Sequence, residues 1–215
     1  MEIIDWILHL DKHLAEFANQ LGPWFYGLLF AIIFGETGLV IAPFLPGDSL
    51  LFAVGALSAS QPDSLNIGVL FPLLVVAAII GDALNYAIGK WVGPQIFRKE
   101  TGWFLNKNHL QRAQAFYEKH GAKAIVLARF LPILRTFAPF VAGIGGMQYR
   151  RFWLYNVIGG ILWVGLFLFA GYAFGTQPFV KDNFHIVILA IVGISALPIA
   201  YEWFKALREN KTAKP

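Results

Sequence analysis

Three apolar stretches of the chain, residues 67–91, 152–175 and 185–203, contain few charged residues. A helix rises about 1.5 Å per residue, so each stretch is close to the length that crosses a hydrocarbon core of roughly 30 Å. Short polar segments, SQPDSLN and TQPFVKDN, precede the first and the last of them. The pattern therefore predicts about three full transmembrane helices.

Residues 23–60 form a fourth apolar stretch, but it is interrupted. Residues 23–35 would make a helix of about 20 Å and residues 49–60 one of about 18 Å, and neither length crosses the core. Pro43, Pro46 and Gly47 lie between them, and proline removes a backbone donor and clashes with the preceding turn. We predict a re-entrant hairpin over residues 23–60, with its tip near the bilayer midplane and covered by protein.

Residues 122–147 repeat this pattern and predict a second re-entrant hairpin, in which Pro132 and Pro139 break the helix around Arg135. Lys and Arg are concentrated in residues 93–121 and in the tail 204–215, which predicts a cytoplasmic loop and a cytoplasmic tail. The two hairpins then enter from opposite faces, as in the inverted repeats of transporters. A full crossing by residues 23–42 is the alternative, and it would place the N-terminus in the cytoplasm.

Residues 1–22 carry apolar side chains at three- and four-residue spacing, which predicts an amphipathic helix lying in the membrane interface. Asp5, His9 and His13 share one face of that helix at a spacing that could hold a metal. Interfacial histidines usually face solvent, and no metal or other cofactor is predicted.

Composition agrees with this pattern. The 215 residues are 57% hydrophobic and 14% charged, whereas a soluble domain is about a quarter charged. The formal charge of +4 is not gathered in a basic run, so nucleic acid is not an expected partner. The absence of cysteine excludes disulfides and thiol catalysis. We predict a single-domain, all-α integral membrane protein with two facing re-entrant hairpins in an inverted repeat.

Four ionisable residues lie at the two interruptions: Glu36, Asp48, Arg129 and Arg135. A charge at the centre of a transmembrane helix costs about 2.5–3.5 kcal/mol, so we expect the acids and the arginines to neutralise each other across the midplane or to line a cavity. Simple capping is the alternative for Asp48, at the start of a helix, and for Arg129, at the end of one.

Asp82 and Tyr86 stand four residues apart and could form a hydrogen bond within one helix. Asp82 is either a functional acid or a residue that holds the second hairpin. Gly47–Leu50 and Asp182–His185 spell the short motifs of a serine esterase family. Ser49 is not expected at a strand-to-helix elbow, so we do not predict an enzyme.

A longer set of residues resembles one membrane protein family. The set comprises Glu36, Thr37, Pro43, Leu45–Asp48, Gly81, Asp82, Tyr86, Gly89, Arg129–Pro132, Arg135, Pro139, Ala142, Gly143, Met147, Phe152, Asn156, Gly159 and Trp163. In this order the chain resembles the DedA family, also described as SNARE-associated or VTT-domain proteins, over residues 23–174. The charged positions of the pattern are all present.

This resemblance implies a multi-pass protein of the bacterial inner membrane with two facing re-entrant hairpins, related to lipid scramblases. It links the chain to recycling of undecaprenyl phosphate, to the proton-motive force and to drug tolerance. By position, Glu36 and Asp48 match the essential acids of the family, and Arg129 and Arg135 match its essential arginines.

These observations lead to the hypothesis of a translocase for undecaprenyl phosphate or a phospholipid. Arg129 and Arg135 would bind the anionic headgroup, and Glu36 and Asp48 would exchange protons. The alternatives are a proton-coupled antiporter of small cations or cationic drugs, and a scaffold without transport. The sequence does not identify the lipid or the direction of transport. The oligomeric state, including a homo-oligomer, is also left open.

Overall fold

The structure is a computed structural model that describes residues 10–39, 47–96, 121–191 and 193. Within these ranges the chain forms helices and turns and no strand, which confirms the predicted all-α class. The elements in chain order are α2 (Leu10–Leu21), α3 (Trp24–Gly38), α4 (Gly47–Ser60), α5 (Ile67–Ile96), the 3-10 turn η1 (Gly121–Lys123), α7 (Ala124–Ala128), α8 (Pro132–Ile144), α9 (Tyr149–Phe174) and α10 (Pro178–Asp182). Residues 184–191 are also helical.

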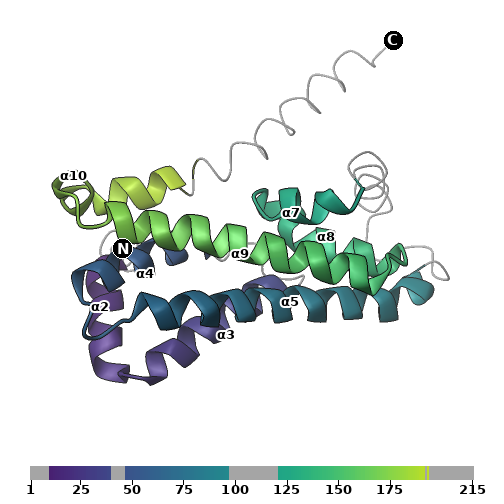
Figure 1. The fold of residues 1–215 in the computed structure, drawn as a ribbon, viewed down its shortest axis with the longest axis horizontal. Coiled ribbons are helices and arrows are strands. Elements are labelled where there is room, and N and C mark those ends of the chain that lie inside the picture. The colour runs from purple at the N-terminus through teal and green to yellow at the C-terminus, as the bar shows by residue number, and fades with distance from the viewer. Residues whose placement is uncertain (1–9, 40–46, 97–120, 192, 194–215) are drawn as a thin grey trace, which may run out of the picture.

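The two longest of these helices, α5 and α9, lie side by side and run in opposite directions (Figure 1). Residues 67–92 of α5 and all 26 residues of α9 are apolar and long enough to cross a membrane. They correspond to two of the three predicted spans, residues 67–91 and 152–175. Of the third, 185–203, the structure describes only 185–191 and 193, so that prediction is not tested.

The other apolar helices are short. The 15 residues of α3, 14 of α4 and 13 of α8 correspond to about 22, 21 and 20 Å. None is as long as a hydrocarbon core of roughly 30 Å. The helix α7 has only five residues, so a pair of short helices precedes each of the two long ones along the chain.

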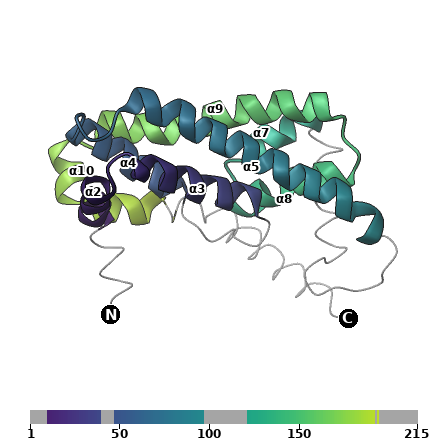
Figure 2. The same cartoon turned by 90° about the horizontal axis from the view of Figure 1, so that it is seen from below.

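The short helices are shared between the two long ones. In the first pair of short helices, α3 packs against α5 and α4 packs against α9. In the second pair the partners are reversed, because α7 packs against α9 and α8 packs against α5 (Figure 2). Exchanging α3, α4 and α5 for α7, α8 and α9 therefore leaves the pattern of neighbours unchanged.

Glycines allow the closest of these contacts. A Cβ at Gly55 of α4 would lie 2.1 Å from the carbonyl oxygen of Leu168, and one at Gly171 of α9 would lie 2.0 Å from that of Phe52. The α5 and α8 interface is built in the same way, by Gly89 and Gly143. Small residues let membrane helices approach until their backbones touch, so side chains at these positions would force the helices apart.

The helix α2 lies across the end of the bundle at which α4 ends and α10 lies (Figure 1, Figure 2). It buries Leu14 and Ala18 and exposes Glu16, as expected for the described part of the amphipathic helix predicted over residues 1–22. Residues 1–9, with Asp5 and His9, lie outside the described ranges.

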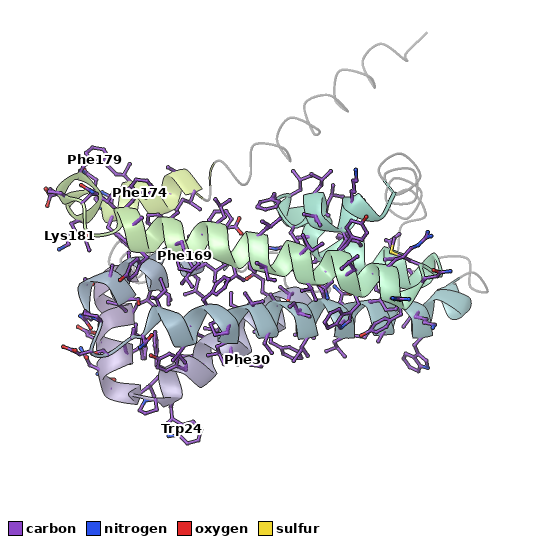
Figure 3. All side chains as sticks on the ribbon, in the orientation of Figure 1. Trp24, Phe30, Phe169, Phe174, Phe179 and Lys181 are labelled. Atoms are coloured by element: carbon purple, nitrogen blue, oxygen red, sulfur yellow. The ribbon has the colours of Figure 1, made fainter. Side chains whose placement is uncertain are left out.

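Exposed aromatic side chains occur at both ends of the bundle. Figure 3 shows Trp24, Phe174 and Phe179 directed away from the helices at one end, together with Lys181. Near the other end, Trp91 and Trp153 are exposed. Such belts of aromatic residues are typical of the two membrane–water interfaces.

The predicted helix breaks are only partly correct. Pro132 does begin a new helix, α8, but this helix continues through Pro139 to Ile144, so the predicted break at Pro139 is wrong. Packing of α8 along α5 holds the helix together there, because neighbouring helices in a membrane compensate for a proline. Gly47 is the first residue of α4. Pro43 and Pro46, most of the predicted loop 93–121 and the tail 204–215 lie outside the described ranges.

Candidate functional site

Three charged side chains from three short helices meet in the interior, and we call them the central cluster: Glu36, Asp48 and Arg135. The Nη1 of Arg135 donates to Oδ1 of Asp48 at 2.8 Å, and its Nη2 donates to Oε1 of Glu36. Their exposed fractions are only 0% for Glu36, 8% for Asp48 and 3% for Arg135. The structure thus brings together three of the four charged residues expected to pair across the two interruptions.

Glu36 also joins the end of α3 to the start of α4. Its Oε1 accepts a hydrogen bond from the backbone N–H of Gly47 at 3.2 Å. The first amides of a helix have no partner within the helix, and the helix dipole favours a negative charge at that place. A Cβ at residue 47 would lie 1.9 Å from Oε2 of Glu36, so only glycine allows the carboxylate to approach this closely.

Asp48 does not act only as a cap of α4, which was the alternative role considered from the sequence. It lies within the first turn of α4, and its Oδ1 accepts hydrogen bonds from two side chains of other helices, Arg135 and Trp163. The carboxylate of Glu36 receives the backbone N–H of Gly47, the first residue of α4. Asp48 therefore contributes to contacts between helices.

Trp163 of α9 completes the surroundings of the central cluster. Its Nε1 donates to Oδ1 of Asp48 at 2.8 Å, and the Cζ of Arg135 lies 4.8 Å from the centre of its ring. The second contact has the geometry of a cation–π interaction. Charge analysis missed this residue; the available signal was a tryptophan in the middle of an apolar span, where its N–H needs a partner.

Arg129, the fourth predicted residue, takes part in a separate set of contacts, the Arg129 cluster, with Asp82 and Asn156. Its Nη2 donates to Oδ2 of Asp82 and to Oδ1 of Asn156, both at 2.5 Å, and lies 3.4 Å from the carbonyl oxygen of Ala78. Arg129 therefore pairs with an acid of α5 and not with Glu36 or Asp48. Asp82 thereby ties α5 to the end of α7, within residues 122–147.

Two further contacts fix Arg129 in place. The Nδ2 of Asn156 donates to the carbonyl oxygen of Ile79 at 3.0 Å, which ties α9 to α5. A Cβ at Gly159 would lie 2.9 Å from the Cδ of Arg129. Because Arg129 is the C-cap of α7, it joins α7 to both long helices.

The two clusters differ in charge. With all groups ionised, the two carboxylates and one guanidinium of the central cluster sum to −1, whereas Asp82 and Arg129 sum to zero. Both clusters keep buried polar atoms that have no hydrogen-bond partner in the part of the chain that the structure describes: Glu36 Oε2 and Arg135 Nε in one, Asp82 Oδ1 and Arg129 Nε and Nη1 in the other. Buried polar atoms are rarely left unpaired, so what distinguishes the central cluster is its net charge.

Tyr86 does not bind Asp82, the partner suggested by their spacing. Its hydroxyl donates to the carbonyl oxygen of Met147 at 2.5 Å, and its ring stacks on Phe152 with centroids 4.4 Å apart. Tyr86 therefore attaches the segment after α8 to α5 and α9.

The residues of the esterase motifs lie on separate elements. Ser49 is buried in the first turn of α4, while Asp182 ends α10 and His185 follows it. No group of three or more metal-binding side chains occurs among the described residues.

The helices and the buried charges together define an all-helical membrane protein with a polar centre. The VTT domain family matches residues 45–173 of the chain. Protein DedA of Escherichia coli K12 is 53% identical over 196 residues, which cover 91% of this chain and 90% of that protein. The chain therefore belongs to the DedA family of VTT-domain membrane proteins.

More distant relatives extend this comparison. The uncharacterized membrane protein Rv0364 of Mycobacterium tuberculosis H37Rv is 44% identical over 85% of this chain and 80% of its own length. Inner membrane protein YghB of Salmonella typhimurium LT2 is 41% identical over 74% of this chain and 71% of its own length. No solved structure is significantly similar to the chain. These relatives support a location in a bacterial membrane.

Proposed function

We propose that the protein moves a lipid phosphate, undecaprenyl phosphate or a phospholipid, between the leaflets of the bacterial inner membrane. The observation that carries this proposal is the position of Arg135, buried between two carboxylates from the other half of the bundle. A charge at this depth is costly, and in membrane proteins such residues mark transport pathways.

In the proposed topology, α3 with α4 and α7 with α8 are re-entrant hairpins that enter from opposite faces. Support comes from the short lengths of α3, α4 and α8, from the antiparallel course of α5 and α9, and from the exchange of neighbours between the two halves. The exposed aromatic residues at both ends of the bundle support a multi-pass arrangement. The central cluster would then lie near the midplane, where the binding sites of inverted-repeat transporters occur.

Arg135 is the residue best placed to bind the phosphate. A guanidinium donates two parallel hydrogen bonds to phosphate oxygens, whereas a lysine acts as a point charge. In the structure these donors are held by Glu36 and Asp48. A phosphate must therefore replace two carboxylates to reach Arg135.

This exchange requires protons. A phosphate anion next to a cluster with a formal charge of −1 would be repelled, because like charges interact strongly in a low-dielectric interior. Protonation of Glu36 and Asp48 releases Arg135 and changes the charge of the cluster to +1. Lipid movement in this proposal is thus coupled to proton uptake from one side of the membrane and proton release to the other.

Arg129 has a supporting role in the proposed cycle. Its charge is balanced by Asp82, and its contacts with α5 and α9 fix the end of α7 close to the start of α8. Its Nε and Nη1 have no hydrogen-bond partner among the described residues, so it can add a donor to a headgroup bound at Arg135.

The proposal is tested by reconstituting the protein in liposomes with labelled undecaprenyl phosphate or phospholipid, with and without a pH gradient. Wild type is compared with Arg135→Lys, Arg129→Ala and Glu36→Gln, and with Ser58→Ala as a matched control that loses one buried hydrogen bond far along α4. Transport by wild type and by the control, and its loss in Arg135→Lys, supports the proposal.

Equal lipid movement in all variants would contradict it. The same liposomes distinguish the alternative, a proton-coupled antiporter of small cations or cationic drugs, for which the −1 charge of the central cluster is the favourable observation. An antiporter would keep appreciable cation exchange in Arg135→Lys, because lysine preserves the positive charge that tunes the acids.

A further inference from the structure

Asn85 of α5 connects the two halves of the bundle next to the central cluster. Its side chain is fully buried, and its Nδ2 donates to the carbonyl oxygen of Thr136 in α8 at 2.7 Å and to that of Thr37 in α3 at 3.3 Å. Thr37 directly follows Glu36, and Thr136 directly follows Arg135. One amide group therefore holds the backbones that carry the two partners of an ion pair.

The chemistry of the two acceptors explains why an amide is suited to this place. Thr37 lies in the last turn of α3, where carbonyl groups have no donor within the helix. Thr136 lies inside α8, and its carbonyl oxygen has a second lone pair. Two acceptors facing one group require two N–H donors, which the NH₂ of asparagine supplies.

The packing around Asn85 also involves α3 on one side and α8 on the other. Gly81, four residues before it, lies against α3, because a Cβ there would be 1.9 Å from Oγ1 of Thr37. Gly89, four residues after it, lies against α8, because a Cβ there would be 2.1 Å from the carbonyl oxygen of Phe140. Residues four apart share one face of a helix, so Asn85 is at the middle of a face that receives α3 at one end and α8 at the other.

Nonspecific packing between helices does not explain why an asparagine occupies position 85. Its Oδ1 has no hydrogen-bond partner in the described part of the chain, and a buried polar atom without a partner is unfavourable. An apolar side chain of similar size would fill the space without that cost. What only asparagine provides is a bond to each of the two backbones.

We propose that Asn85 is a positioning residue that sets the distance and register between Glu36 and Arg135. Its hydrogen bonds go to the two threonine carbonyls and to neither charged side chain, so it acts through the backbones that carry them. This proposal rests on the proposed function in one respect: it takes the central cluster to be the site of transport. Without Asn85, the ends of α3 and α8 separate more easily, and the ion pair no longer forms in a single geometry.

The first test measures geometry without reference to transport. The chain has no cysteine, so spin labels can be attached to Leu39→Cys, at an exposed position after α3, and Leu134→Cys, in α8. Pulsed dipolar EPR then compares the label distances with Asn85 intact, in Asn85→Leu, and in Ser58→Ala as the control. Asn85→Ala serves as a second variant should Asn85→Leu fail to fold. We expect a broader distance distribution in the Asn85 variants. In the control, the width of the distribution should be unchanged.

The second test measures transport of labelled lipid phosphate in liposomes. Loss of the two hydrogen bonds is expected to lower the rate about 25-fold, at about fivefold for each bond. The coupling to Glu36 is measured by thermal unfolding in detergent, because the Glu36→Gln background lacks an acid of the proposed transport cycle. The decrease in melting temperature caused by Asn85→Leu should be much smaller in that background, because residues that act through one interaction are not additive. Ser58→Ala should lower the melting temperature by the same small amount in both backgrounds.

The outcomes separate the two proposals. Broader distances in a protein whose wild type moves no lipid phosphate support the role of Asn85 and reject the proposed function. An unchanged distance distribution in Asn85→Leu overturns the role of Asn85, whether or not transport falls. Additive decreases in melting temperature for Asn85→Leu and Glu36→Gln also overturn it.

Discussion

The indole N–H of Trp163 and the guanidinium of Arg135 donate to the same oxygen, Oδ1 of Asp48, each at 2.8 Å. One long helix, α9, thus fixes a carboxylate that the first half of the chain presents to the second. Replacing Trp163 with Phe keeps an aromatic ring over Arg135 but removes the donor. We expect transport to fall about fivefold, as for the loss of one buried hydrogen bond of about 1 kcal/mol.

Trp153→Phe is the matched control for this change, because Trp153 lies on the same helix but is exposed. Lipid transport in liposomes is the measurement. An equal loss in both variants would mean that the N–H of Trp163 has no specific role.

Replacing Arg135 should reduce the stability of the protein more than replacing Glu36. Arg135→Gln leaves two buried carboxylates without a cation, and breaking a buried pair in this way costs about 3–5 kcal/mol. Glu36→Gln leaves one carboxylate with one guanidinium, a neutral pair. Thermal unfolding in detergent should therefore show a large decrease in melting temperature for Arg135→Gln and a smaller one for Glu36→Gln. The reverse order would contradict the contacts described for the central cluster.

Gly47 should not tolerate a side chain. A Cβ would overlap Oε2 of Glu36, and crowding of a packed interior costs about 1–3 kcal/mol. We expect Gly47→Ala to lower the melting temperature and to slow transport, because Glu36 must move. Gly27→Ala in α3 is the control, since a Cβ at residue 27 meets no atom within 4 Å. A Gly47→Ala protein as stable and active as Gly27→Ala would refute the close approach.

Asp82 and Arg129 should behave as a coupled pair. Asp82→Asn leaves a buried guanidinium unbalanced, at a cost of about 3–5 kcal/mol. Adding Arg129→Gln removes that charge, so the double variant should be less destabilised than the sum of the two single variants, by about 0.5–3 kcal/mol. Asp63→Asn, at an exposed acid in the turn before α5, is the control and should change stability little. Strictly additive losses would show that the two residues act independently.

Hydropathy and charge predicted a large part of this arrangement. Apolar length identified α5 and α9, and the cost of isolated charges in a membrane predicted that Arg135 would meet acids from the first interruption. These predictions rest on quantities that belong to single residues or to single segments, and such quantities can be read directly from a sequence.

Other features depend on which helices become neighbours. Arg129 pairs with Asp82 because α7 lies beside α9 and close to α5, and no spacing along the chain reveals that. The same holds for Pro139, whose helix is preserved by its packing on α5. Asn85 was not singled out, and Trp163 was named only in the resemblance to the family and not as a site residue, because neither is charged. Each nevertheless carries an N–H in an otherwise apolar segment and so requires a partner.

The exchange of neighbours between the halves has a consequence for biogenesis. When synthesis has reached the end of α5, α3 already has its partner, but the face of α4 that carries Gly55 has none until α9 is made. The nascent first half must therefore wait in the bilayer with one face of α4 unmatched and with three uncompensated acids, Glu36, Asp48 and Asp82. A chain truncated before α9 should remain unassembled and become a substrate for membrane proteases.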